Sequence, residues 1–248
     1  MIVRRDAGAA PRNAAVTAPS ILPCVTLVEP PGGGVPAAFP PPGVETVVFD
    51  VVGTLVTPDP TVAAIYRATA LRRGIDVGEE DVRAAFARAW RRQETLDAAA
   101  VPPYVTSRAR ERDRWRSIVE DVFPGSAQAP QIFAELWDHF GSPSAWRPLE
   151  QGVALVAAAR AAGVEVALAS NFDERLLAIA PAIAPLALAR HVFASSELGW
   201  RKPALGFFRA VEARLGRRPD QLLLVGDDPR LDLAAARSAG WHARAVDA

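Results

Sequence analysis

The chain of 248 residues contains one cysteine, Cys24, and has a formal net charge of zero. A single cysteine excludes an intramolecular disulfide framework and any metal site built from several thiolates. The balanced charge lacks the strong basic or acidic excess that favours binding to nucleic acid or to a polyanion. No apolar run reaches the length of about 18 residues that a membrane span requires. These absences predict a cytoplasmic globular protein with neither nucleic acid nor membrane as its partner.

Lysine and histidine are also scarce. Lys202 is the only lysine, although arginine is frequent, and the three histidines (His139, His191 and His242) lie far apart in the sequence. A histidine metal site is therefore not expected. A single lysine in a chain that otherwise uses arginine for positive charge favours a specific role for Lys202.

The first 43 residues differ in composition from the rest of the chain. They hold nine prolines, a run of three glycines and only five charged residues. Proline without periodicity builds neither a helix nor a central strand. We therefore expect residues 1–43 to form a disordered Pro/Gly-rich extension.

The residues that follow the extension show two kinds of pattern. Residues 61–147 carry apolar side chains at helical spacing, which predicts an all-helical unit. Residues 44–60 and 148–248 alternate short apolar runs with helical segments of about ten residues, which predicts right-handed βαβ units. The expected fold is thus an α/β fold, a Rossmann-like doubly wound parallel sheet interrupted by an inserted helical domain. The strands are expected at Val44–Phe49, Val164–Ala169, His191–Ala194, Leu222–Val225 and His242–Val246, and the last of them is expected to be buried. Helices are expected between them at Val153–Ala162, Glu174–Ala184, Leu205–Leu215 and Leu231–Ala239.

Polar residues follow four of these strands at the carboxyl end, where parallel sheets bind their ligands. Asp50 follows the first strand. The others are Ser170 and Asn171, then Lys202, and finally Asp227, Asp228 and Asp232. One carboxylate at a strand end is commonly a turn residue or a helix cap, but four successive strand ends of this kind indicate a shared site.

These residue types suit one chemistry. A carboxylate can act as a nucleophile and form a covalent aspartyl intermediate. A lysine can offset the negative charge of the nucleophile and substrate, and hydroxyl and backbone N–H groups can hold phosphate oxygens. Carboxylate oxygens are hard ligands that suit Mg²⁺.

The same residues resemble, in order and spacing, the four motifs of the haloacid dehalogenase superfamily. Asp50, Gly53, Thr54 and Leu55 match its first motif, Asp-x-Asp-Gly-Thr-Leu. Ser170 matches the second motif, Lys202 the third, and Asp227 with Asp232 the fourth. Residues 61–147 look like the C1 cap of subfamily I, and the sequences around Asn171 and Lys202 are most similar to the rhythmically-expressed-gene-2 branch.

The resemblance implies a hydrolase that uses Mg²⁺ and acts on a small phosphorylated metabolite. Asp50, Thr54, Ser170 and Lys202 would be catalytic, and Gly53, Asn171 and Arg201 would bind the substrate. The metal would be held by Asp50, the backbone carbonyl of Val52 and Asp227, supported by Asp228 or Asp232.

Position 52 departs from the pattern of the family's phosphatases. Those enzymes have a second aspartate there, which protonates the leaving group and then activates water. Such general acid–base help is commonly worth about 10²–10⁴ in rate, and the side chain of Val52 cannot supply it. The first motif therefore keeps the nucleophile and the metal ligand but lacks the proton shuttle.

Three functions remain open from the sequence. The leading one is the Mg²⁺-dependent hydrolase. The second is a metal-independent, dehalogenase-type hydrolase, since a halide leaves without a proton, although the acidic stretch at Asp227 and Asp228 favours a cation. The third is a catalytically impaired binding protein that keeps the fold. A phosphonatase is disfavoured because it needs a cap lysine, and Lys202 is the only lysine in the chain.

Overall fold

The computed structural model describes residues 39–247 of the chain. Most of the expected N-terminal extension (residues 1–43) lies outside these residues, and so does Cys24. The predicted disorder of the extension therefore stays a prediction.

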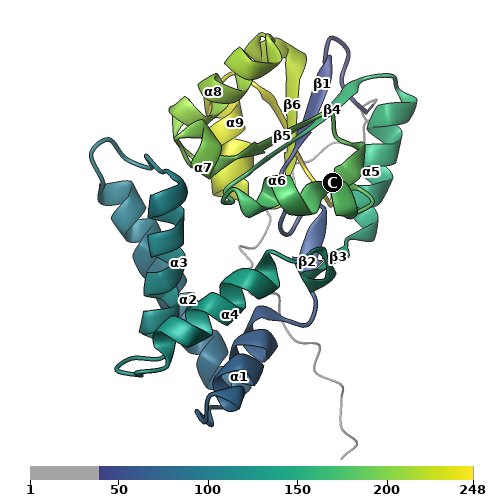
Figure 1. Ribbon diagram of the computed structural model, residues 1–248. Coiled ribbons are helices and arrows are strands. Elements are labelled where there is room, and N and C mark those ends of the chain that lie inside the picture. Colours follow the sequence, from purple (N-terminus) through teal and green to yellow (C-terminus); the bar gives the residue numbers. More distant parts are fainter. Residues whose placement is uncertain (1–38, 248) are drawn as a thin grey trace, which may run out of the picture. The chain divides into compact units, whose positions relative to one another are not determined.

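Five parallel strands form the central sheet (Figure 1). In spatial order they are β5 (His191–Ala194), β4 (Glu165–Ser170), β1 (Thr46–Phe49), β6 (Leu222–Gly226) and β7 (His242–Ala245). The central strand β1 is buried along its whole length, as its apolar sequence predicts. Phe49 lies opposite Leu168 of β4 and Val225 of β6, so these three strands end at the same level.

Helices cover both faces of the sheet, because alternate residues of each strand face opposite sides. Val47 and Phe49 belong to the apolar cluster that α5 and α6 complete, whereas Val48 belongs to the cluster of α8 and α9. This two-sided cover confirms the doubly wound, Rossmann-like α/β fold. The four helices are α5 (Glu150–Ala161), α6 (Arg175–Ile179), α8 (Leu205–Leu215) and α9 (Ala235–Ser238).

Four further helices, here called the helical insert, lie where the helical spacing predicts them. They have an apolar cluster of their own, in which Tyr66, Ile118 and Ile132 are fully buried. Thr61 caps the start of the first helix, because its side chain accepts a hydrogen bond from the backbone N–H of Ala64. The helices are α1 (Val62–Arg72), α2 (Glu79–Ala99), α3 (Arg108–Val122) and α4 (Ala129–Phe140).

A short antiparallel pair of strands joins the two ends of the helical insert. β2 (Val56–Pro58) leads into it, and β3 (Trp146–Pro148) leads out of it. Sequence patterns did not predict this pair, because three-residue strands are too short to show alternation. The pairing brings the entry and exit of the insert together, a few residues after Asp50.

Two predicted helices are shorter than expected. The segment Glu174–Ala184 was expected to be helical throughout, but α6 ends at Ile179 and gives way to a 3₁₀ turn that contains Pro181, which has no N–H to donate. The predicted helix Leu231–Ala239 begins as a π-helical turn, Pro229–Ala234, and only its last part is α9.

The last strand was expected to be buried, and this prediction is wrong for His242. β7 lies at the edge of the sheet, and His242 is exposed. Within residues 39–247, no helix combines the length and the apolar character that crossing a membrane requires. The remaining short elements are α7 (Ser195–Leu198) and 3₁₀ turns at Pro143–Ala145, Leu186–Leu188 and Pro219–Gln221.

Candidate active site

The predicted site residues meet at the carboxyl ends of the parallel strands. Asp50 directly follows β1, Ser170 is the last residue of β4, and Asp227 directly follows β6. Because these strands end at the same level, their terminal side chains are brought together. Lys202 follows β5 and the short helix α7, and its side chain reaches the same place.

Asp50 is held by two donors that reach the same oxygen. The hydroxyl of Ser170 donates to Oδ1 of Asp50 at 2.9 Å, and Nζ of Lys202 donates to Oδ1 at 2.7 Å. No donor within residues 39–247 forms a hydrogen bond with Oδ2. The carboxylate is therefore oriented through Oδ1, whereas Oδ2 remains available to react or to bind a cation.

Lys202 is buried between two carboxylates. Its side chain is 2% exposed, and Nζ forms ion pairs with both Asp50 and Asp232. Burial on its own would lower the pKa of Lys202, but the negative charges of Asp232 and Asp50 outweigh it and raise the pKa above its ordinary value. Lys202 thus carries a fixed positive charge beside Asp50.

The remaining carboxylates of the site lie close enough to disfavour each other's ionisation. Burial, followed by the charges of Asp50 and Asp232, raises the pKa of Asp227 to about 7. Burial also raises the pKa of Asp232, to about 6, with Lys202 opposing the rise. Thr54 donates a hydrogen bond to Oδ1 of Asp227 at 3.1 Å and favours its charged form.

Two glycines make room for these carboxylates. A Cβ on Gly53 would lie 2.3 Å from Oδ2 of Asp227, and Gly53 also has a φ of +89° that favours glycine. A Cβ on Gly226 would lie 2.4 Å from Oδ2 of Asp232. Gly53 was expected to bind the substrate, and the structure gives it this contact with Asp227.

The acidic group has the composition of a cation site. Asp50, Asp227 and Asp232 each offer an oxygen, and these oxygens lie within 4.8 Å of one another. The backbone carbonyl of Val52, which is also a predicted ligand, accepts no hydrogen bond from any residue in the described part of the chain. Three clustered carboxylates, two of which (Asp227 and Asp232) have raised pKa values, and a carbonyl that accepts no hydrogen bond fit a hard divalent cation such as Mg²⁺.

Asp228 lies outside this group. Its carboxylate accepts hydrogen bonds from the backbone N–H groups of Arg230 and Leu231, at 2.8 and 2.7 Å. It therefore caps the helical turn after β6, the ordinary role of an aspartate at such a position. The expected support of a metal by Asp228 is not part of this geometry, whereas Asp232 lies within the acidic group.

Asn171 binds the backbone on both sides of Lys202. Its Nδ2 donates to the carbonyl of Lys202 at 2.9 Å, and its Oδ1 accepts from the N–H of Lys202 at 2.7 Å. The amide is occupied by these two bonds, so it serves to place the lysine. A substrate-binding role, expected from the sequence, has no support in this arrangement.

Arg201 was also expected to bind an anionic substrate, but its charge is already matched. Its Nη1 donates to both carboxylate oxygens of Glu111 on α3, at 2.6 and 2.8 Å. The side chains of Arg201 and Glu111 are both buried. Sequence reasoning missed Glu111, because α3 is rich in charged residues and nothing in its pattern distinguishes the two buried ones, Glu111 and Arg114, from the exposed ones.

The side chain of Val52 does not replace the missing acid. It is 37% exposed, in the turn between Asp50 and Gly53. The site therefore keeps all of its predicted motif carboxylates except the one that would shuttle a proton.

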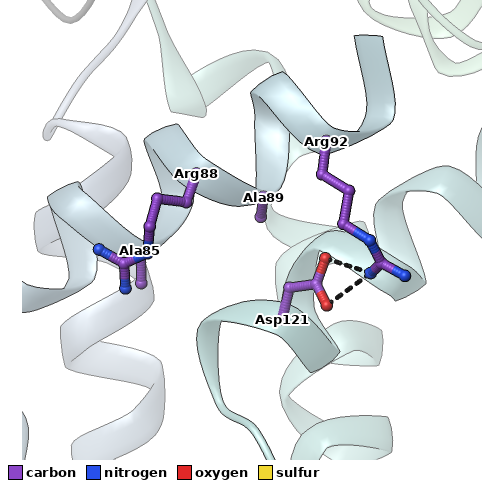
Figure 2. Close-up of a pocket in the computed structure, with 5 residues that line it drawn as sticks. All are labelled: Ala85, Arg88, Ala89, Arg92 and Asp121. Carbon is purple, nitrogen blue, oxygen red and sulfur yellow. Dashed lines mark hydrogen bonds and ion pairs between the residues drawn. The ribbon is translucent and has the colours of Figure 1, made fainter. Parts of the chain in front are cut away.

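One surface cavity lies on the helical insert and includes no predicted site residue (Figure 2). It is lined by α2 and α3, and Arg92 forms an ion pair with Asp121 at its edge, at 2.7 Å. Both side chains of this pair are partly exposed. This partly exposed pair contrasts with the buried ion pair of Arg201 and Glu111.

Comparisons with known proteins agree with this geometry. The family model of haloacid dehalogenase-like hydrolases matches residues 44–240. The chain therefore belongs to the haloacid dehalogenase-like hydrolases. The motif residues named above all lie within the matched range.

Similar proteins and structures fit the family. The chain is 29% identical over 203 residues to mouse haloacid dehalogenase-like hydrolase domain-containing protein 3, covering 78% of each chain. It is 31% identical over 134 residues to a phosphoserine phosphatase of Thermus thermophilus, covering 52% of this chain and 53% of that protein. The fold matches L-2-haloacid dehalogenase of Xanthobacter autotrophicus, with a TM-score of 0.59, 20% identity and coverage of 81% and 76% of the two chains.

A magnesium-bound putative HAD-hydrolase of Bacillus subtilis has the same fold. Its TM-score is 0.57 at 15% identity, with 81% of this chain and 87% of that chain covered. At these identities the structures establish the fold alone.

Proposed function

We propose that this hydrolase cleaves a small phosphorylated metabolite, with Asp50 as the nucleophile and Mg²⁺ as the cofactor. The observation that carries the proposal is the placement of Asp50, whose Oδ1 receives hydrogen bonds from both Ser170 and Lys202. The similarity to a phosphoserine phosphatase supports a phosphate ester as the substrate class.

The proposed reaction has two steps, and residues of the site assist both. In the first, a carboxylate oxygen of Asp50 attacks phosphorus, the ester P–O bond breaks, and the leaving oxygen takes a proton. In the second, water attacks the aspartyl phosphate and releases phosphate. Lys202 stabilises the negative charge around Asp50, and Ser170 keeps the carboxylate oriented.

The acidic group would hold the cation through Asp50, Asp227, Asp232 and the carbonyl of Val52. When bound, Mg²⁺ would neutralise negative charge on the phosphoryl oxygens. Thr54 and Gly53 contribute by fixing Asp227, through a hydrogen bond and through the space for its carboxylate. We propose further that the helical insert is the cap that covers the substrate.

Because Val52 cannot transfer a proton, we expect both steps to be slow. The proton for the leaving group has to come from solvent or from the substrate, since position 52 supplies none. Loss of a general acid–base residue commonly costs about 10²–10⁴ in rate. A protein that binds phosphorylated ligands with little turnover is therefore the second candidate function, and Val52 is the observation that favours it.

The test is a panel of small phosphate esters assayed with Mg²⁺ and again with EDTA. Wild type and Asp50→Asn are compared, because asparagine keeps the shape of the side chain and lacks the nucleophilic charge. The proposal predicts slow release of phosphate that both EDTA and Asp50→Asn abolish. Hydrolysis that survives EDTA would favour the metal-independent reaction, and Mg²⁺-dependent ligand binding without phosphate release would favour the binding protein.

A further inference from the structure

The helical insert contacts the turn that carries Lys202. The backbone N–H of Arg201 donates to the carbonyl of Tyr104 at 2.9 Å, and the N–H of Thr106 donates to the carbonyl of Gly199 at 3.0 Å. These bonds join the loop between α2 and α3 to the residues immediately before Lys202. The backbone of the lysine turn is thereby tied to the insert.

A buried ion pair lies beside these backbone bonds. The guanidinium of Arg201 is 3% exposed and makes a two-oxygen contact with Glu111, which is 2% exposed. Arg201 also lies 3.6 Å from carboxylate oxygens of Glu94 and of Asp97, both on α2. Burial on its own would raise the pKa of Glu111, but the charge of Arg201 outweighs it and holds the pKa below its ordinary value.

Glu111 fixes this position, because within residues 39–247 it is the only side chain that forms hydrogen bonds with the guanidinium of Arg201. A guanidinium that is taken out of water needs a matching charge in good geometry. Without Glu111, the charges of Glu94 and Asp97 remain near Arg201, but at 3.6 Å and without a hydrogen bond. Thr106 donates from its hydroxyl to Oε1 of Glu111 at 2.8 Å, so the carboxylate itself is oriented. The next residue in the chain is Lys202, which has to hold Nζ between Asp50 and Asp232.

We propose that Glu111 is a positioning residue, which holds Arg201 from the helical insert and through it sets the place of Lys202 beside Asp50. The inference rests on the proposed role of Lys202 in the site. It adds that the site is complete only while the insert is docked on the lysine turn.

The test uses the fact that Lys202 is the only lysine in the chain. Reductive methylation with formaldehyde and a borane therefore modifies Nζ of Lys202 and, apart from it, only the amine at the start of the expressed chain. Mass spectrometry of the peptide that carries Lys202 gives its rate, and the terminal amine is the internal reference. Wild type is expected to react slowly, because Nζ is buried and bound by two carboxylates.

Glu111→Gln removes the charge and keeps the shape, and it is expected to raise the methylation rate of Lys202 by about tenfold or more, because the turn opens more often. Glu111→Asp keeps the charge and is expected to stay within about threefold of wild type. Asp121→Asn is the matched control, since it removes the charge of the partly exposed pair with Arg92 in the same insert. It is expected to leave the rate unchanged.

The double variant Glu111→Gln, Arg201→Gln guards against a failure of Glu111→Gln to fold, because a neutral pair leaves no buried charge unmatched. It too is expected to react faster than wild type by about tenfold. A folded double variant or a folded Glu111→Gln that reacts at the wild-type rate would overturn the proposal. Methylation requires no turnover, so the result stands apart from the outcome of the phosphatase panel.

Discussion

The hydroxyl of Thr54 donates to the carboxylate of Asp227 at 3.1 Å, and this bond links the turn after β1 to the end of β6. The residue before Thr54 takes part in the same arrangement, because the absence of a side chain at Gly53 leaves the space that Asp227 fills. The glycine and the threonine of the first motif therefore act on a carboxylate of the fourth. This relationship gives the first prediction.

Gly53→Ala should weaken both folding and cation binding. The new Cβ would overlap the carboxylate of Asp227, and the alanine would also have to adopt a positive φ. Gly74→Ala is the matched control, because Gly74 has a similar φ of +78° with no neighbouring atom within 4 Å of the new Cβ. We expect Gly53→Ala to lose about 1–3 kcal/mol more free energy of unfolding than Gly74→Ala, as chemical denaturation measures. Equal losses, or unaltered Mg²⁺ affinity in Gly53→Ala, would speak against this role of Gly53.

Val52→Asp should raise the rate of phosphate release. The side chain at this position is partly exposed, so a carboxylate adds little cost to folding. The new acid would protonate the leaving group and activate water, and we expect kcat to increase by about 10–100-fold. Val52→Asn is the control, because asparagine has the same shape and cannot exchange a proton at neutral pH. An equal increase in both variants would mean that polarity, and not proton transfer, limits the wild type.

Binding of Mg²⁺ should weaken as the pH falls below about 7. Burial and the charges of Asp50 and Asp232 raise the pKa of Asp227 to about 7, so below this pH the cation has to displace a proton. The apparent affinity is expected to fall by about tenfold for each pH unit below the pKa of Asp227, and to change little above it. Calorimetric titration at pH 6, 7 and 8, in buffers of different ionisation enthalpy, would measure the affinity and the released proton. An affinity that is constant from pH 6 to 8 would contradict this assignment.

Asn171→Ala should loosen Lys202 without altering contacts to the substrate. The variant loses both hydrogen bonds to the backbone of Lys202, at an expected cost of about 1–3 kcal/mol in the free energy of unfolding. Methylation of Lys202 should become faster, and kcat should fall with KM nearly unchanged. A rise in KM with unaltered methylation would instead favour the substrate-binding role that the sequence suggests for Asn171.

Much of the fold follows from local sequence patterns. The runs at His191–Ala194 and Leu205–Leu215 predict the bounds of β5 and α8, because apolar periodicity and a following turn residue define them locally. The meeting of Asp50, Ser170 and Asp227 also follows from the sequence, since parallel strands end at one edge of the sheet. Local pattern and general topology together are sufficient for these features.

Other features depend on tertiary contacts that no local pattern encodes. Asn171 and Arg201 look like anion-binding residues in the sequence. Only the fold shows that Asn171 forms hydrogen bonds with the backbone of Lys202 and that Arg201 forms an ion pair with Glu111. Asp228 and Asp232 are likewise alternative supports of a metal in the sequence. The turn after β6 directs the first to cap the backbone and the second into the acidic group.

Mass spectrometry of the protein, quenched in acid during reaction with a small phosphate ester and Mg²⁺, tests whether Asp50 is the nucleophile. Because position 52 has no base to activate water, the aspartyl phosphate should accumulate. We predict one phosphoryl group on the peptide that contains Asp50 in wild type and none in Asp50→Asn. Steady release of phosphate with no phosphoryl group on that peptide, and the same release by Asp50→Asn, would show that Asp50 is not the nucleophile.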